Sequence, residues 1–207
     1  MFHRLVVLVA AVAALFVLVP SALAVRVHVR IEGKTRTIFG STAPLLDVTS
    51  PRANPSPENA LDALEAAGSL GEFFYHVTVA SFGPYVDQIG RYPAGGTSGW
   101  VYKLNGVSPP VGANEALLKT GDTVLWYWAQ FGAAGGPKTL VLSRSGRCYT
   151  VLAQDDNGKT SPAAGAVLRV GPHRNVATRS GRACVGAHPG LLVRAELGGA
   201  VRSNALP

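Results

Sequence analysis

The segment GWVYKLNGVSPPVGANEALLKTGDTVLWYW, residues 99–128, decides the fold that we expect for this chain. Its first part, GWVYKL, alternates large apolar side chains with other residues, as a half-buried strand does. Asn105-Gly106 follows directly, and this pair accepts the positive φ angles of a tight hairpin turn. The last part continues into TVLWYWAQF, residues 123–131, which is apolar on both faces. This composition predicts a second strand in the centre of its sheet.

The residues before this segment complete the predicted sheet. VRVHVRI, residues 25–31, alternates apolar with polar side chains and predicts a strand, and FFYHVTVASF, residues 73–82, predicts another. Segments rich in Gly, Pro, Ser and Thr at 40–55 and 83–96 are expected to be loops. We therefore expect an α+β arrangement, a mixed sheet with one helix across one face.

The helix is expected at SPENALDALEAAG, residues 56–68. Ser56 is a suitable N-cap, and Pro57 suits the first helical position because its missing N–H needs no partner there. Gly68 follows the apolar stripe and is the expected C-cap.

The second half of the chain has a different pattern. GAAGGP, residues 132–137, has the composition of a linker. Short strands with turn signals between them follow, and they predict a small all-β sandwich over residues 138–207. The predicted strands of this part are CYTVLAQ (148–154), AVLRVG (166–171), RACVGA (182–187) and GLLVRAEL (190–197).

The two cysteines, Cys148 and Cys184, lie in the first and third of these strands. In an oxidising compartment they are expected to form a disulfide that ties non-adjacent strands together. The alternative is a zinc site with His173 and His188, although the cysteines lack CxxC spacing. We expect the disulfide and no metal.

The first 24 residues resemble a secretory signal peptide. A basic start precedes an unbroken apolar run, and small residues follow at Ala22 and Ala24. The alternative is an uncleaved membrane anchor, for which the apolar run is short. We therefore expect a secreted, extracellular protein without stable membrane insertion after cleavage of the signal.

Charge is distributed unevenly between the two halves. Residues 25–137 contain eight basic and nine acidic residues, whereas residues 138–207 contain ten basic and three acidic ones. A basic sandwich would bind anionic polymers of the cell envelope or membrane surfaces. The alternative is that these arginines are merely solvated surface. No nucleic-acid partner is expected.

The motifs of the central segment resemble a known family. The segment is similar to a secreted bacterial family of unknown function related to the C-terminal β-domain of transcobalamin and intrinsic factor. This resemblance covers residues 25–131 and implies a β-grasp-like ligand-binding domain, with a corrinoid-like ligand by analogy alone. The later strands resemble prealbumin-like or immunoglobulin-like sandwiches. The motif residues are Gly99, Trp100, Tyr102, Asn105, Gly106, Gly112, Lys119, Gly121, Asp122, Val124 and Trp126.

The aromatic residues of the two strands are the candidate ligand site. Alternate residues of a strand share a face, so one aromatic set is expected under the helix and the other on an open face. An open aromatic face would hold a small flat ligand or a partner domain. The alternative is that loops or the second domain cover it. The candidate ligand-binding residues are Trp100, Tyr102, Trp126, Trp128 and Tyr85.

The sequence contains no recognised catalytic motif. It lacks HExxH, a Walker loop and a nucleophile elbow, and DDNGK reads as a hairpin turn at Asn157-Gly158 rather than a calcium loop. We therefore expect a non-catalytic protein without a cofactor. The two functions that we keep are a secreted module that binds an unknown small molecule and a structural or adhesive protein of the cell envelope.

Overall fold

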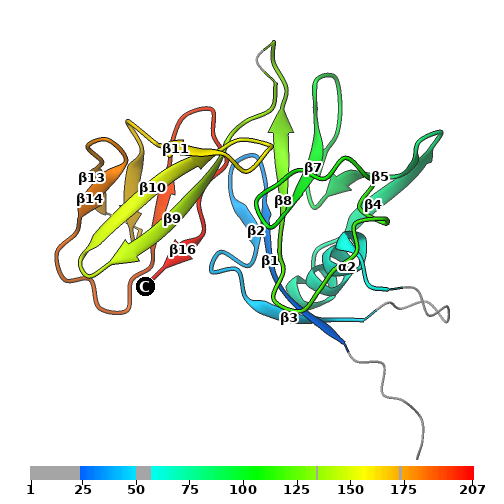
Figure 1. Cartoon of the computed structure of the whole chain (residues 1–207), viewed down its shortest axis with the longest axis horizontal. Coiled ribbons are helices and arrows are strands. Elements are labelled where there is room, and N and C mark those ends of the chain that lie inside the picture. The colour runs from blue at the N-terminus through cyan, green and yellow to red at the C-terminus, as the bar shows by residue number, and fades with distance from the viewer. Residues whose placement is uncertain (1–23, 50–56, 134, 173) are drawn as a thin grey trace, which may run out of the picture.

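A computed structural model of the chain describes residues 24–49, 57–133, 135–172 and 174–207 (Figure 1). Within these ranges the protein is mostly β-structure, with one helix and several sheets. The first sheet has the order β2-β1-β8-β7, and β3 also pairs with β1. Its strands are β1 (Val25–Glu32), β2 (Thr37–Phe39), β3 (Leu45–Val48), β7 (Ser98–Leu104) and β8 (Thr123–Gln130).

The prediction of a central apolar strand is confirmed by β8. It pairs in parallel with β1 on one side and antiparallel with β7 on the other. The Asn105-Gly106 turn is also present, because both residues have positive φ and Leu104 and Val107 exchange two backbone hydrogen bonds. The chain then leaves the sheet for an irregular segment, 108–122, before it returns as β8.

The helix, α2 (Ala60–Gly71), begins later than predicted. Asn59 is the N-cap, and its side chain accepts hydrogen bonds from the backbone N–H of Leu61 and Asp62. The Asp62 carboxylate in turn accepts from the backbone N–H of Asn59. This reciprocal capping box satisfies three backbone donors, which explains why the helix begins here rather than after Ser56. Ser56 itself lies outside the described residues.

The predicted C-cap at Gly68 is also wrong. The helix continues to Gly71, and Glu72 takes the left-handed conformation with φ 49°. Gly68 lies on the buried side of the helix, where an added Cβ would lie 3.3 Å from the carbonyl oxygen of Phe73. This glycine therefore allows close packing inside the helix instead of ending it.

Both predicted loops of the first half contain strands. β3 lies within 40–55, and β5 (Gly83–Ile89) and β6 (Tyr92–Pro93) lie within 83–96. β5 pairs with β4 (Tyr75–Ala80) and β6 in a three-stranded sheet. Gly83 has φ 109° and starts β5 directly after the turn. This glycine marks a tight hairpin, so reading it as a loop residue was wrong.

The second half forms two four-stranded sheets around a separate core. The largest side chains of this core, those of Tyr149, Leu140 and Leu168, are completely buried. All four predicted strands of this part are present, and the additional ones were missed. The first sheet contains β9 (Thr139–Ser145), β10 (Cys148–Gln154), β11 (Thr160–Pro162) and β14 (Arg182–Cys184), and the second contains β12 (Val167–Val170), β13 (Arg174–Ala177), β15 (Val193–Glu196) and β16 (Ala205–Leu206).

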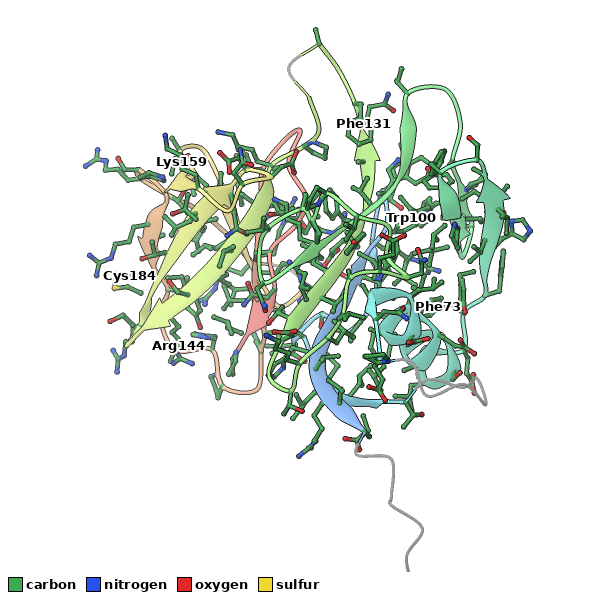
Figure 2. The ribbon with its side chains drawn as sticks, turned by 45° about the vertical axis from the view of Figure 1, so that its right-hand side comes forward. Phe73, Trp100, Phe131, Arg144, Lys159 and Cys184 are labelled. Carbon is green, nitrogen blue, oxygen red and sulfur yellow. A yellow bond between two sulfur atoms is a disulfide. The ribbon has the colours of Figure 1, made fainter. Side chains whose placement is uncertain are left out.

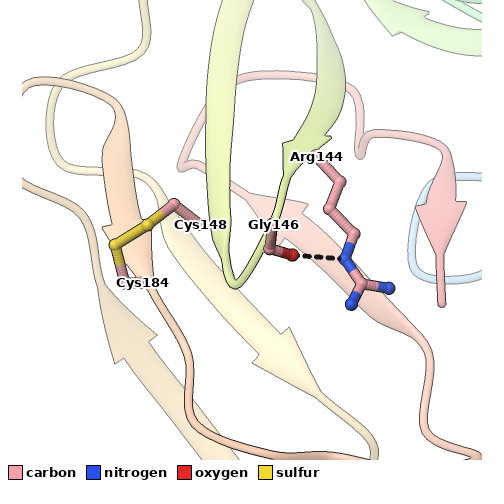
Figure 3. Close-up of a disulfide and its surroundings, with 4 residues drawn as sticks. All are labelled: Arg144, Gly146, Cys148 and Cys184. Atoms are coloured by element: carbon pink, nitrogen blue, oxygen red, sulfur yellow. Dashed lines mark hydrogen bonds between the residues drawn. A yellow bond between two sulfur atoms is a disulfide. The ribbon is translucent and has the colours of Figure 1, made fainter.

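The predicted disulfide between Cys148 and Cys184 is confirmed (Figure 3). It does not tie non-adjacent strands, because the two cysteines lie directly opposite each other on paired strands. β9 pairs along the whole of β10 on one side, while β14 and β11 share the other side. The order of the strands along the sequence does not reveal that β11 and β14 pair with different parts of the same side of β10. Beside the bridge, Arg144 Nε donates to the Gly146 carbonyl at 2.8 Å and closes the β9–β10 turn.

The two halves contact each other across one face of the first sheet, near the centre of Figure 1. Leu125 and Tyr127 of β8 are buried with Val201, which precedes β16. Lys103 of β7 is fully buried in the same interface. Its ammonium group donates to Thr139 Oγ1 at 3.1 Å and to the Asp155 carbonyl at 2.7 Å. Burial lowers the pKa of Lys103.

A buried ion-pair cluster extends this interface. The side chain of Glu32 is 1% exposed and accepts from Arg30 Nη1 at 3.0 Å within β1. Arg202 of the second half donates to the same carboxylate at 3.0 Å through Nε and to the Gly33 carbonyl at 2.6 Å. Thr37 donates a further hydrogen bond to it. Residues that the alternation of β1 placed toward water are therefore enclosed by the second half.

The predicted signal peptide falls outside the described residues except for Ala24, and its cleavage remains a prediction. The division of the chain at residues 132–137 also remains a prediction. Across the ranges that the structure describes, no helix has the length and apolar character required to span a bilayer.

Candidate functional site

Four of the five aromatic residues of β7 and β8 lie on one face of the first sheet, and Tyr127 lies on the other. Trp100 is paired with Trp128, and Tyr102 with Trp126, across the β7–β8 ladder. This face packs against α2 and the β4–β5–β6 sheet, and the opposite face packs against the second half. The expectation that one aromatic face remains open is therefore wrong, because elements from both parts of the chain cover the two faces.

The indole groups are anchored from within. Trp100 Nε1 donates to the Tyr92 carbonyl at 2.8 Å, and Trp126 Nε1 donates to the Ala60 carbonyl of α2 at 3.2 Å. Both tryptophans are 2% exposed. Figure 2 shows Trp100 in the interior, beside the β7–β8 pair. These rings therefore belong to the core of the first half, and each contributes only a small exposed area to the surface.

A cleft of about 530 Å³ nevertheless opens beside them. Its walls are β5, the edge of β7 and the segment 108–113. Four of the five predicted residues line it, namely Tyr85, Trp100, Tyr102 and Trp126. The other lining residues are mostly apolar: Leu61, Phe82, Pro84, Val86, Val101, Ser108, Pro109, Pro110, Val111, Gly112, Ala113, Tyr127, Phe131 and Asp156.

Trp128 does not line this cleft. It lies edge-on to Trp100, with ring centroids 5.8 Å apart, and both rings also contact Tyr92. Its ring lines a different cavity, together with Lys34 and Arg202. The period of two places Trp126 and Trp128 on the same face of β8, as expected, but both aromatic sets share one face of the sheet instead of lying on two, and position along the strand separates Trp128 from the cleft.

The wall opposite β5 is held by a small number of contacts. Tyr102 Oη donates to the Val111 carbonyl at 2.8 Å, which fixes the segment after Pro109-Pro110. The pyrrolidine rings restrict the backbone there, so the wall is stiff for an irregular segment. Sequence reasoning missed this wall. The SPP sequence was a local signal, but nothing in it indicated that this segment lines the same cleft as Tyr85.

The cleft carries little charge, and that charge is negative. Asp156 is the one charged residue among those that line it, and it accepts from Ser108 Oγ at 3.1 Å. Burial, with a smaller contribution from Glu115, raises the pKa of Tyr102 to about 12. Burial and the Asp156 carboxylate raise the pKa of Tyr127 to about 12 as well. Both phenols are therefore neutral hydrogen-bond donors at physiological pH.

Polar groups line a second cavity of about 550 Å³, between the two halves, which includes His28, Arg30 and Lys103. His76 bonds to Asp87 at 2.7 Å on the exposed β4–β5 ribbon, and His188 contacts Tyr149 Oη at 2.9 Å. His173 lies outside the described residues. Among the residues that are described, no group of three or more His, Cys, Asp or Glu side chains could hold a metal ion.

A family match covers most of the residues that line the cleft. Residues 58–130 match the family described as Domain of unknown function (DUF4430). The DUF4430 match begins just before α2 and ends with β8, so it includes Tyr85, Trp100, Tyr102 and Trp126. No curated protein matches the chain.

A solved structure resembles part of the chain. It is the 1.30 Å crystal structure of a candidate metal binding protein from Ruminococcus gnavus ATCC 29149. The two share 10% sequence identity over 51% of this chain and 97% of that chain, with a TM-score of 0.38. This likeness is too low to assign a ligand to the cleft.

Proposed function

We propose that the protein is a secreted, non-catalytic binding module whose cleft takes a ligand with a small, flat apolar part. The observation that carries this proposal is the cleft of about 530 Å³ beside Tyr85, Trp100, Tyr102 and Trp126. Ligand sites usually have volumes of about 300–1,000 Å³ and apolar walls with a few polar groups. The phenol of Tyr102 and the carboxylate of Asp156 are such polar groups.

The fold is consistent with this proposal. A parallel β1–β8 pair with a helix packed on one face is the arrangement expected of a β-grasp-like domain, and the two sheets of the second half are those expected of a sandwich. The disulfide and the absence of a membrane-spanning helix among the described residues are compatible with secretion. No contact in the cleft points specifically to a corrinoid, so that ligand is suggested by resemblance alone.

Substitution of Val111 tests the proposal in a matched pair. Val111 lines the cleft and is 42% exposed, and Leu192 is 42% exposed in the second half away from the cleft. We expect Val111→Glu to weaken binding of the neutral, flat dye Nile red at least about tenfold, because a carboxylate is costly to desolvate in an apolar site. Leu192→Glu should leave the affinity unchanged, as measured by dye fluorescence.

The dye experiment can also contradict the proposal. If the folded wild-type protein does not bind Nile red, the proposal that the cleft binds a flat apolar ligand is contradicted. Equal loss of affinity in both variants would show that the dye does not occupy the cleft. Circular dichroism on both variants confirms that they are folded.

A second candidate function is adhesion to anionic envelope polymers through the basic second half. Six arginines there are exposed, whereas Arg194 and Arg202 turn inward toward Glu196 and Glu32. Cosedimentation with cell walls should be abolished by about 1 M salt if this surface carries adhesion, because screening then acts within about 3 Å. The exposed arginines are Arg144, Arg147, Arg169, Arg174, Arg179 and Arg182.

A further inference from the structure

We propose that the ligand of the cleft is an extended peptide whose main chain pairs with the open edge of β7. This inference rests on the proposed function, because it names the class of ligand for the same cleft. In this arrangement an aromatic side chain of the peptide supplies the flat apolar part.

The cleft runs along a strand edge. Three consecutive residues of β7, Trp100, Val101 and Tyr102, all line it. Successive side chains point to opposite faces of a sheet, so one cavity can contact all three only at the edge of the strand. β7 is the last strand of its sheet and pairs only with β8.

The hydrogen-bond pattern shows which groups face this edge. The backbone N–H of Phe131 donates to the Thr97 carbonyl, and that of Asn105 donates to the Thr123 carbonyl. The backbone N–H and C=O groups of the odd-numbered residues along β7 therefore point toward β8. In an antiparallel ladder the direction alternates from residue to residue, so the even-numbered residues of β7 point their backbone groups the other way.

The two ends of the open edge are already occupied. Ser98 exchanges two backbone hydrogen bonds with Gly95, and Leu104 exchanges two with Val107. Both are even-numbered and both bond on the side away from β8, as the alternation requires. These turns limit the free edge to the stretch between them.

Trp100 and Tyr102 occupy that stretch. Each presents one N–H and one C=O toward the cleft, and these four groups have no protein partner in the part of the chain that the structure describes. Trp100 is only 2% exposed, so its groups are poorly solvated. Buried backbone groups are nearly always paired in folded proteins. An added strand would pair them, as it does where peptides extend an exposed sheet edge.

The charge of the cleft selects among peptides. Asp156 lines one side, and Glu115 lies close enough to act on the Tyr102 phenol. No basic residue is found among those that line the cleft. A peptide with an aromatic residue for the apolar wall and lysine beside it complements both features.

The test uses the full protein and the peptide acetyl-Lys-Phe-Val-Phe-Lys-amide, which is expected to displace Nile red. Two N-methylated versions of this peptide are compared. The first carries a methyl group on the backbone nitrogen of each Phe, and the second carries one on the backbone nitrogens of Val and of the last Lys. Only alternate residues of an added strand face β7. One version should therefore bind about tenfold or more weakly than the parent, and the other within about threefold.

A protein-side pair tests the same edge. Tyr102→Ala and Tyr102→Pro both remove the ring, but only proline removes the N–H that faces the cleft, and an edge strand tolerates proline at such a position. We expect Tyr102→Pro to bind the parent peptide about tenfold more weakly than Tyr102→Ala, with equal Nile red affinity.

The outcomes separate the two proposals. If Nile red binds but the parent peptide does not displace it, or if both methylated versions behave alike, the peptide inference is overturned and the binding module remains. If neither probe binds, the proposed function fails as well. Displacement with opposite responses of the two methylated versions supports both.

Discussion

Replacement of Glu32 by glutamine is expected to lower the free energy of unfolding by about 3–5 kcal/mol, the range found when one partner of a buried ion pair is removed. The Glu32 side chain is 1% exposed and forms ion pairs with both Arg30 and Arg202. Burial already lowers the pKa of Arg30, so its guanidinium depends on this partner. Without the negative charge, the buried Arg30 and the partly buried Arg202 remain as two cations at the junction between the halves.

Urea denaturation measures this effect, and a surface pair provides the control. Arg26 and Asp47 form an ion pair of the same 3.0 Å length, but their side chains are 58% and 69% exposed. Asp47→Asn should cost no more than about 1 kcal/mol, because solvent screens exposed pairs. Similar losses in the two variants would contradict the view that the cluster at Glu32 holds the halves together.

Removal of the disulfide has the second largest expected effect. Cys148 and Cys184 are 36 residues apart in the sequence, and a closed loop of that size restricts the unfolded chain. The double variant Cys148→Ser, Cys184→Ser should lose about 3–4 kcal/mol of stability in urea denaturation. At low urea, where the double variant is still folded, it should bind Nile red when protein is in saturating excess over dye. The reason is that the disulfide lies in the second half, away from the cleft.

Reduction provides the control for that variant. Wild-type protein treated with dithiothreitol should lose the same stability, and the reductant should not affect the double variant. A loss below about 1 kcal/mol in both cases would show that pairing of β10 with β14 holds this region without the covalent bond.

The parts of the fold that local sequence pattern controls could be predicted. The period-two alternation of residues 25–31, the Asn105-Gly106 turn and the apolar run of β8 each led to the observed element. The capping box at Asn59 and the strand β5 were missed, since the proline and glycine signals beside them suggested other boundaries. In both cases a specific interaction, the side-chain hydrogen bonds of the cap or the turn before β5, determines where the element begins, and amino-acid composition does not reveal it.

The site was predicted only in part, for a physical reason. Nothing in the sequence indicated that Arg30 and Glu32 are enclosed, because the residue that bonds to both, Arg202, is about 170 positions away: its side chain pairs with Glu32 and its carbonyl accepts from Arg30. The burial of the second sheet face follows from that distant contact. Trp100, Tyr102 and Trp126 were predicted because two strands concentrate aromatic residues, whereas Val111 and Asp156 belong to the cleft only through tertiary packing.

The most direct test of the cleft is a nitrogen-15 NMR titration of the three indole N–H groups with Nile red. Trp100 and Trp126 line the cleft, and Trp128 lies beyond it as an internal control. The cleft account predicts saturable shifts of the Trp100 and Trp126 signals, with that of Trp128 changed least. Saturation of the dye signal with both cleft indoles unmoved, or with Trp128 alone shifted, would contradict it.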